Sequence, residues 1–216
     1  MISPVARVVQ VFFKAPIKGK VKTRLIPSVG EDGSVIVHQR LCEQVIQCVT
    51  GYAAQQTESD VRVQFWVDMG VDHPFVTEKA EQYGVDVFKQ VGDDLGQRMA
   101  NALAVGLNSA EQVVVVGGDC YSLCSHYLMQ AFDMLESHDL VLGPADDGGY
   151  ILLGVTSIEP SMLQNIEWGV STVLQATVDR AEQSGKRVGL LDERWDIDTL
   201  EDIQRHAPEL LLGLVV

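Results

Sequence analysis

The sequence predicts an α/β protein: a three-layer α/β/α sandwich around a mostly parallel sheet. Three observations favour this fold class. Short, nearly continuous runs of apolar and β-branched residues recur along the chain, as they do in buried parallel strands. Between these runs lie stretches in which apolar residues have helical spacing. The two kinds of segment alternate almost throughout, which predicts a sheet with helices on both faces.

The most distinct predicted strand is the all-valine run Val113–Val116. Further strands are predicted over Val8–Phe13, Val61–Val67, Val85–Phe88, Asp139–Gly143, Tyr150–Val155 and Val188–Leu191. Helices are predicted over residues 33–55, 74–83, 94–107, 125–137, 171–184 and 199–206, with Ser171 as the N-cap of the fifth.

Length and charge limit the organisation and the partners of the protein. A chain of 216 residues without an internal repeat or linker predicts one domain over residues 1–216. The net charge of −14 repels nucleic acids and anionic lipids, so no nucleic-acid partner is expected. The sequence contains neither a signal-peptide pattern nor an apolar run of membrane-spanning length, which predicts a cytoplasmic protein. The oligomeric state is left open.

A basic loop follows the first predicted strand. It contains Lys14, Ala15, Pro16, Gly19, Lys22 and Arg24, together with Lys18 and Lys20. Ligands of such sheets bind at the carboxyl ends of the strands. The backbone N–H groups near Gly19 and the surrounding cations suit a polyphosphate, although no Walker A pattern is present. The alternative is a basic loop that only faces solvent.

The segment Gly117-Gly118-Asp119-Cys120 directly follows the all-valine strand and contains Asp119. This position places a carboxylate at the rim of the expected ligand site, where it could hold Mg²⁺ or a ribose. Alternatively, Asp119 only caps the turn or the next helix.

The segment Gly143–Tyr150 contains two adjacent carboxylates, Asp146 and Asp147, followed by Gly148 and Gly149. The glycines allow the backbone to approach a ligand closely. One of the two aspartates could orient an acceptor, take its proton or bind a metal. Asp-Gly is also a strong turn signal, so a plain hairpin turn is an equal alternative.

Two further segments carry candidate site residues. Asp196 and Asp198 alternate along an extended stretch and could complete a metal site, although Asp198 could instead be an N-cap with Glu201 as its capping-box partner. In the other segment, Arg98 could reach a phosphate or a base, and Gly96 permits close approach. Here the alternative is that Asp94 caps the helix and Arg98 is merely exposed.

These segments, in this order, resemble the bacterial radical-SAM/selenodomain-associated transferase family, whose members are similar to GT-A-type nucleotide-diphospho-sugar transferases. The matching segments are Lys14–Pro16 through Lys22–Leu25, Asp94–Met99, Gly118–Cys120, Gly143–Tyr150 and Asp196–Thr199. In this sequence, Gly118 replaces the usual Thr of the family and Tyr121 the usual Pro. The resemblance implies a GT-A-like sandwich, a nucleotide pocket in the N-terminal half and a metal at Asp119 that bridges a diphosphate. The basic loop is also similar to that of guanylyltransferases.

The leading hypothesis is a metal-dependent transferase, a glycosyltransferase that uses a nucleotide-diphospho-sugar and Mg²⁺ or Mn²⁺. Asp147 and Lys22 are the expected catalytic residues, and Asp119 and Asp198 the expected metal ligands. The expected nucleotide side comprises Lys14, Ala15, Pro16, Gly19, Lys22, Arg24, Asp94, Gly96 and Arg98, and the acceptor side Asp146, Gly148, Gly149 and Tyr150. One alternative is a nucleotidyltransferase that moves NMP from an NTP to a small phosphorylated acceptor. Another is a non-catalytic nucleotide-binding protein.

Overall fold

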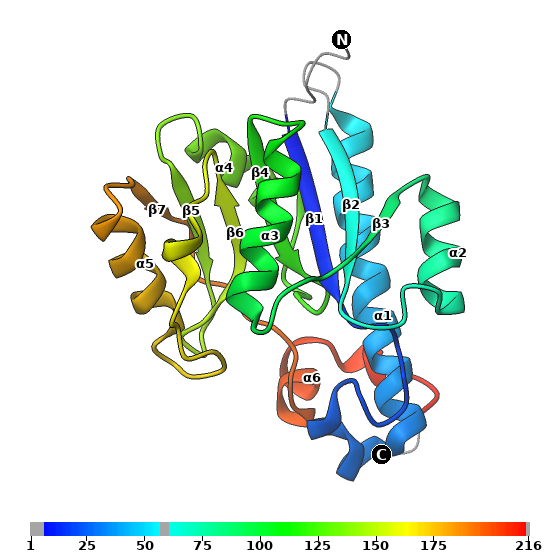
Figure 1. Cartoon of the computed structure of the whole chain (residues 1–216). Helices are drawn as coiled ribbons and strands as arrows, with labels where there is room; N and C mark the ends of the chain where they lie inside the picture. The colour runs from blue at the N-terminus through cyan, green and yellow to red at the C-terminus, as the bar shows by residue number, and fades with distance from the viewer. Residues whose placement is uncertain (1–6, 57–60, 215–216) are drawn as a thin grey trace.

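The computed structural model describes residues 7–56 and 61–214 and confirms the predicted fold class. A seven-stranded sheet lies between layers of helices, in the order β3-β2-β1-β4-β6-β5-β7 (Figure 1). The strands are β1 (Arg7–Phe13), β2 (Val61–Val67), β3 (Asp86–Lys89), β4 (Gln112–Gly117), β5 (Leu140–Pro144), β6 (Tyr150–Val155) and β7 (Val188–Leu190).

Strand β6 runs against the direction of the rest of the sheet. It pairs antiparallel with β4 and with β5, whereas the β1–β2, β1–β4, β2–β3 and β5–β7 pairs are parallel. Only residues 145–149 separate β5 from β6. So short a connection can form a hairpin but not a crossover, which explains the one reversed strand.

The helices cover both faces of the sheet. They are α1 (Ile26–Gln55), α2 (Pro74–Tyr83), α3 (Leu95–Leu107), α4 (Ser125–Met134), α5 (Val173–Gln183) and α6 (Leu200–His206), with short 3₁₀ turns η1 (Thr23–Leu25), η2 (Pro160–Leu163) and η3 (Pro208–Leu211). Along β1, Val9 and Val11 pack with α1, α2 and α4, whereas Val8 and Phe12 pack with α3 and α5. This alternation is the period-two pattern of a strand buried on both faces.

Several helix boundaries differ from those predicted. Helix α1 begins at Ile26 and is interrupted at Gly30, whose φ is 72°. Because of this interruption, the spacing of apolar residues does not predict the first turn of α1. Pro27 is nevertheless compatible with a first helical turn. Helix α4 ends at Met134, before the predicted Ser137. Helix α5 begins at Val173 after Thr172, so the prediction of Ser171 as its N-cap is wrong.

A separate apolar cluster joins the C-terminal segment to η1 and α1. It contains Leu25, Val37, Leu41, Ile197, Ile203 and Leu210. Figure 1 shows α6 beside the first turns of α1, at the end of the sheet where β1 finishes. This packing brings the segment before α6 to the basic loop. Over the described ranges, none of the helices has both the length and the apolar character needed to cross a bilayer.

Candidate functional site

Two adjoining cavities lie at the carboxyl ends of the parallel strands. The first has a volume of about 480 Å³ and the second a volume of about 280 Å³. Phe12, Leu95 and Asp119 line both. The carboxylate of Asp119, two residues beyond the end of β4, therefore lies at the boundary between two compartments, where groups bound on either side could meet.

The first cavity is lined mainly by basic and polar side chains. The basic residues are Lys14, Lys20, Lys22, Arg24, His38 and Arg98, and the other polar side chains include Asp68, Gln90, Asp119 and Asp198. Gathering cations in this way is notable in a chain of net charge −14. The cavity can accept an anion because it supplies both charge and donors.

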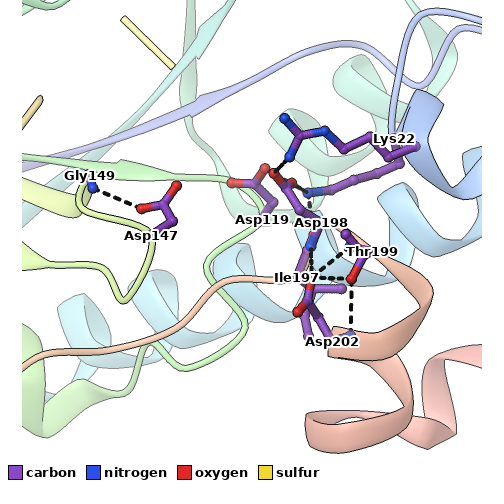
Figure 2. A network of polar contacts seen from close by, with 9 residues as sticks. Lys22, Asp119, Asp147, Gly149, Ile197, Asp198, Thr199 and Asp202 are labelled. Carbon is purple, nitrogen blue, oxygen red and sulfur yellow. Dashed lines mark hydrogen bonds and ion pairs between the residues drawn. The ribbon is translucent and has the colours of Figure 1, made fainter. Parts of the chain in front are cut away.

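Lys22 occupies the centre of a network of polar contacts (Figure 2). Its side chain is only 5% exposed, and Nζ lies 3.0 Å from Oδ2 of Asp119 and 2.8 Å from Oδ1 of Asp198. The same atom donates to the carbonyl oxygen of Ile197. An ammonium has three N–H donors, so these acceptors use all of them. The backbone of Lys22 is left-handed, with φ of 41°, a conformation that costs energy in a residue other than glycine.

Lys22 and Asp119 are both charged at neutral pH. Burial by itself lowers the pKa of Lys22, but the charges and hydrogen bonds of Asp119 and Asp198 outweigh burial and raise it above its usual value. Burial likewise acts to raise the pKa of Asp119, and the Lys22 ammonium reverses the effect and lowers it. Asp119 therefore presents a carboxylate, not a carboxylic acid, to either cavity.

Asp198 pairs with two cations and does not cap α6. Its Oδ2 atom accepts a hydrogen bond from Nη1 of Arg24 at 3.0 Å, in addition to the bond between Oδ1 and Lys22. The N-cap is Thr199, and its capping-box partner is Asp202 instead of Glu201. Oδ2 of Asp202 accepts from the backbone N–H groups of Thr199 and Asp198 at 2.7 and 3.1 Å. The capping alternative for Asp198 is therefore wrong, and Asp202 holds its backbone in place.

The donor atoms fit a divalent metal at Asp119 better than at Asp198. Both oxygens of Asp198 are engaged by Lys22 and Arg24, whereas Lys22 engages only Oδ2 of Asp119. Among residues 7–56 and 61–214, no group of three or more His, Cys, Asp or Glu side chains is arranged to hold a metal. Mg²⁺ commonly needs only one or two carboxylates when substrate phosphates and waters supply the other oxygens. Asp119 fits such a site.

The basic loop divides into cavity-lining and turn-forming residues. Lys14, Lys22 and Arg24 line the first cavity, together with Lys20. The backbone carbonyl of Lys14 also lies 2.8 Å from Nε2 of His38. The predicted nucleotide-side residues Ala15 and Pro16 are instead buried, and Gly19 forms a turn with φ of 71°. These three lie outside the cavity lining.

At the start of α3, one predicted residue lines the first cavity and two only support the local structure. Asp94 is the N-cap, and its Oδ1 atom accepts from the backbone N–H of Gln97 at 2.8 Å. Gly96 packs against η2, since a Cβ there would lie 2.2 Å from the carbonyl oxygen of Leu163. Arg98 alone of the three predicted residues lines the first cavity, and its Nη1 atom lies 2.9 Å from Oδ1 of Asp68. Arg98 is therefore paired with Asp68, whereas the alternative from sequence was an Arg98 that is merely exposed.

The β5–β6 hairpin contributes to the second cavity. Asp147, Gly149 and Tyr150 line it, whereas Asp146 is exposed and lies outside both linings. Oδ1 of Asp147 accepts from the backbone N–H of Gly149 at 2.8 Å. In Figure 2 Asp147 lies on the opposite side of Asp119 from Lys22, with one carboxylate oxygen directed to Gly149. Gly148 has φ of 87°, and a Cβ there would lie 2.1 Å from the carbonyl oxygen of Ser171, so only glycine fits this turn.

Asp196 lies in the second cavity and Asp198 in the first. Burial, followed by the charges of Asp119 and Asp198, raises the pKa of Asp196 to about 7. The two aspartates, expected to act as a pair, therefore serve different compartments. The protonation of Asp196 therefore responds to pH near neutrality.

The structure adds lining residues that the sequence analysis did not single out. Asp68 and Gln90 line the first cavity and each follows a strand directly, β2 and β3 respectively. Asp119 was selected from the sequence because it comes just after a strand. The same criterion could have selected Asp68 and Gln90. His38, in the middle of α1, and Trp168, in the loop before α5, reach the cavities only through tertiary packing, and no local pattern marks them.

Solved structures support the fold and a nucleotide-using class of relatives. A proposed nucleotide-diphospho-sugar transferase from Desulfovibrio desulfuricans G20 matches with a TM-score of 0.80 and 26% identity, over 94% of this chain and 87% of that one. Glucosyl-3-phosphoglycerate synthase from Mycobacterium tuberculosis, solved with Mn²⁺ and UDP, matches with a TM-score of 0.57 and 12% identity, over 96% and 79%. The inositol-1-phosphate CTP transferase from T. maritima matches with a TM-score of 0.56 and 15% identity, over 98% and 97%.

At such low identity the last two likenesses show the shared GT-A-like fold alone. A search among curated proteins finds no significant match. Residues 52–170, more than half of the chain, match the family described as "Uncharacterized protein conserved in bacteria (DUF2064)", and the chain belongs to this family.

Proposed function

We propose that this protein is a metal-dependent transferase that uses a nucleotide-activated donor, and specifically a glycosyltransferase that uses a nucleotide-diphospho-sugar. One observation carries the proposal. A basic cavity large enough for a nucleotide and a smaller, acidic and apolar cavity meet at Asp119. A transferase needs this arrangement, because donor and acceptor must be held side by side with the reacting atoms at the boundary.

The first cavity would hold the donor. Lys14, Lys20, Arg24 and Arg98 supply cations around it, and these suit the oxygens of a diphosphate. Lys22 would act at its inner wall, where it keeps Asp119 ionised and in place. A phosphate oxygen that enters the cavity would compete with the two carboxylates for the Lys22 ammonium.

Asp119 would hold Mg²⁺ or Mn²⁺ through the oxygen that Lys22 leaves free. When bound, the metal would offset the negative charge that develops on the leaving diphosphate. Asp198 would serve as the counter-ion of Lys22 and Arg24, a different role from that of the metal ligand expected earlier.

The second cavity would hold the acceptor. Asp147 lines it together with Asp119, and its carboxylate is oriented by Gly149 (Figure 2). A carboxylate at this place could accept the proton of an acceptor hydroxyl as that group attacks the donor. Its hydrogen bond to the backbone N–H of Gly149 restricts the side chain to this orientation.

The second candidate function is nucleotidyl transfer, in which an NTP donates NMP and pyrophosphate leaves. The observation in its favour is the density of cations in the first cavity, which would also suit a triphosphate. The fold likeness to the T. maritima CTP transferase is compatible with this chemistry.

A donor screen distinguishes the two. The full chain is incubated with Mn²⁺ and either UDP-glucose, GDP-mannose or ADP-glucose, or with each of the four NTPs, and the released UDP, GDP, ADP or pyrophosphate is quantified. Release of a nucleoside diphosphate that Asp119→Asn abolishes supports the proposal. Pyrophosphate release from an NTP would support the second candidate. Calorimetry that detects no Mn²⁺-dependent binding of any of these nucleotides would refute both.

A further inference from the structure

The second cavity differs from the first in its charge. Its charged lining residues are Asp119, Asp147 and Asp196. Over the described ranges, neither a lysine, an arginine nor a histidine lines it. The basic side chains of the site all belong to the first cavity.

Among the described residues, no side-chain cation at the wall of the second cavity compensates these carboxylates. Asp119 is paired with Lys22, whose three donors are already used by Asp119, Asp198 and Ile197. The guanidinium of Arg194 lies over the ring of Tyr127, 4.8 Å from its centroid, and is not part of the lining. A phosphate monoester carries about −1.5 to −2 charges at pH 7 and would meet the carboxylate of Asp147 without a side-chain counter-ion.

The rest of the lining is apolar and aromatic. It comprises Phe12, Leu95, Met99, Val115, Ile151, Leu152, Leu153, Val170 and Val173, together with the rings of Tyr150 and Trp168. These two rings stand edge to face with centroids 6.4 Å apart. At about 280 Å³ the cavity lies at the small end of ligand sites, which hold apolar bodies and orient them with a few polar groups.

We infer that the second cavity binds a small, largely apolar alcohol or amine that carries no phosphate group. The apolar walls take the body of the ligand, and the hydroxyl or amino group lies at the acidic boundary beside Asp147 and Asp119. Describing this ligand as the acceptor rests on the proposed function, whereas its chemical class rests on the lining alone. The inference disfavours a phosphorylated acceptor.

Three compact probes that share an aromatic body test the inference: 2-phenylethanol, tyramine and phenyl phosphate. The indole N–H signal of Trp168 reports binding by ¹H–¹⁵N NMR, because this ring lines the second cavity and not the first. Trp168→Phe identifies the signal. We expect 2-phenylethanol and tyramine to shift it, and phenyl phosphate to do so about tenfold more weakly, since juxtaposed like charges oppose binding.

Val170→Lys tests the charge argument directly. Val170 lines the second cavity and is 37% exposed, so the chain can accommodate a lysine there. This variant should strengthen phenyl phosphate binding about tenfold and weaken that of tyramine. The matched control is Val105→Lys, at an exposed position on α3 outside both cavities.

Phenyl phosphate that shifts the Trp168 signal of the unmodified chain as strongly as 2-phenylethanol would overturn the inference. So would a Trp168 signal that neither neutral nor cationic probe shifts up to its solubility limit. Because no nucleotide is present, these outcomes do not depend on donor binding. Failure of the donor screen with normal tyramine binding would refute the proposed function and leave this inference standing.

Discussion

The Nζ atom of Lys22 lies 3.0 Å from Oδ2 of Asp119, which joins the loop after β1 to the end of β4. The two residues are 97 positions apart in sequence, and β1 and β4 are adjacent in the sheet. A second bond from the same ammonium to Asp198 ties both strands to the segment before α6. One buried cation therefore links three distant parts of the chain at the boundary of the two cavities.

Replacing Lys22 by Met removes this cation while keeping most of the stem. We expect the affinity for UDP to fall roughly 10- to 100-fold, because without this cation the carboxylates of Asp119 and Asp198 would repel the diphosphate. Uridine, which carries no phosphate, should bind unchanged. Isothermal calorimetry measures both ligands. The control is Lys18→Met, in the same loop but paired with Asp32 and outside both cavities. Equal losses for UDP and uridine would mean that Lys22 only supports the fold.

Replacing Asp119 by Asn should abolish the increase in UDP affinity that Mn²⁺ produces. An amide keeps the size of the side chain but removes the negative charge that a hard cation requires. Titrations with and without Mn²⁺ measure the effect, and Asp198→Asn provides the comparison. If the metal is held at Asp119, the second variant keeps the Mn²⁺ dependence although its pairing with Lys22 and Arg24 is weakened. A loss confined to Asp198→Asn would assign the metal to that residue instead.

The raised pKa of Asp196 predicts a specific pH dependence of stability. The folded protein holds the proton of this carboxyl group up to about pH 7, whereas the unfolded chain releases it near its ordinary value of 3.8. The folded state therefore binds more protons in this window, and its stability falls as the pH rises from about 4 to about 7. Asp196→Asn should remove this slope and stabilise the protein by about 1–2 kcal/mol at pH 8.

Urea unfolding at several pH values in the presence of EDTA measures that slope. Asp72→Asn, at an exposed carboxylate away from both cavities, should leave it unchanged. A slope that persists in Asp196→Asn would assign the pH response to other groups.

Replacing Gly148 by Ala should disrupt the β5–β6 hairpin. The added Cβ would lie 2.1 Å from the carbonyl oxygen of Ser171, on a backbone with φ of 87°. Strain and overpacking together should cost about 2–5 kcal/mol, seen as a lower melting temperature. Gly185→Ala separates the two causes, since its φ is 73° and no atom lies within 4 Å of the added carbon. It should cost only about 1 kcal/mol. Similar losses in both variants would indicate that the contact with Ser171 relaxes.

The capping box of α6 predicts a difference between two neighbouring acids. Asp202→Ala should destabilise the protein by about 1 kcal/mol, because its carboxylate accepts from the backbone N–H groups of Thr199 and Asp198. Glu201→Ala removes an exposed acid of the same turn and should be close to neutral. Chemical denaturation measures both. A larger loss from Glu201→Ala would restore the capping box expected from sequence.

The strands and most of the helices could be predicted because their signals are local. The all-valine run, Asp119 after it and the alternation along β1 each reflect burial on both faces of a sheet. The first turn of α1 escaped prediction because Gly30 interrupts its period. The sequence left the N-cap of α6 open because Asp198 and Thr199 are equally good capping residues, and only the contacts of Asp198 with Lys22 and Arg24 distinguish them.

The sequence alone determined which residues could carry the chemistry: a basic loop after one strand, an aspartate after another and a glycine-bearing hairpin. Tertiary structure decided which of them meet. Sheet order places β1 beside β4, and the apolar contacts of Ile197 and Ile203 bring the C-terminal segment back to the basic loop. Pairings over such separations depend on packing of the whole chain, which local periodicity does not encode. The division of one acidic protein into a basic and an acidic compartment follows from that packing.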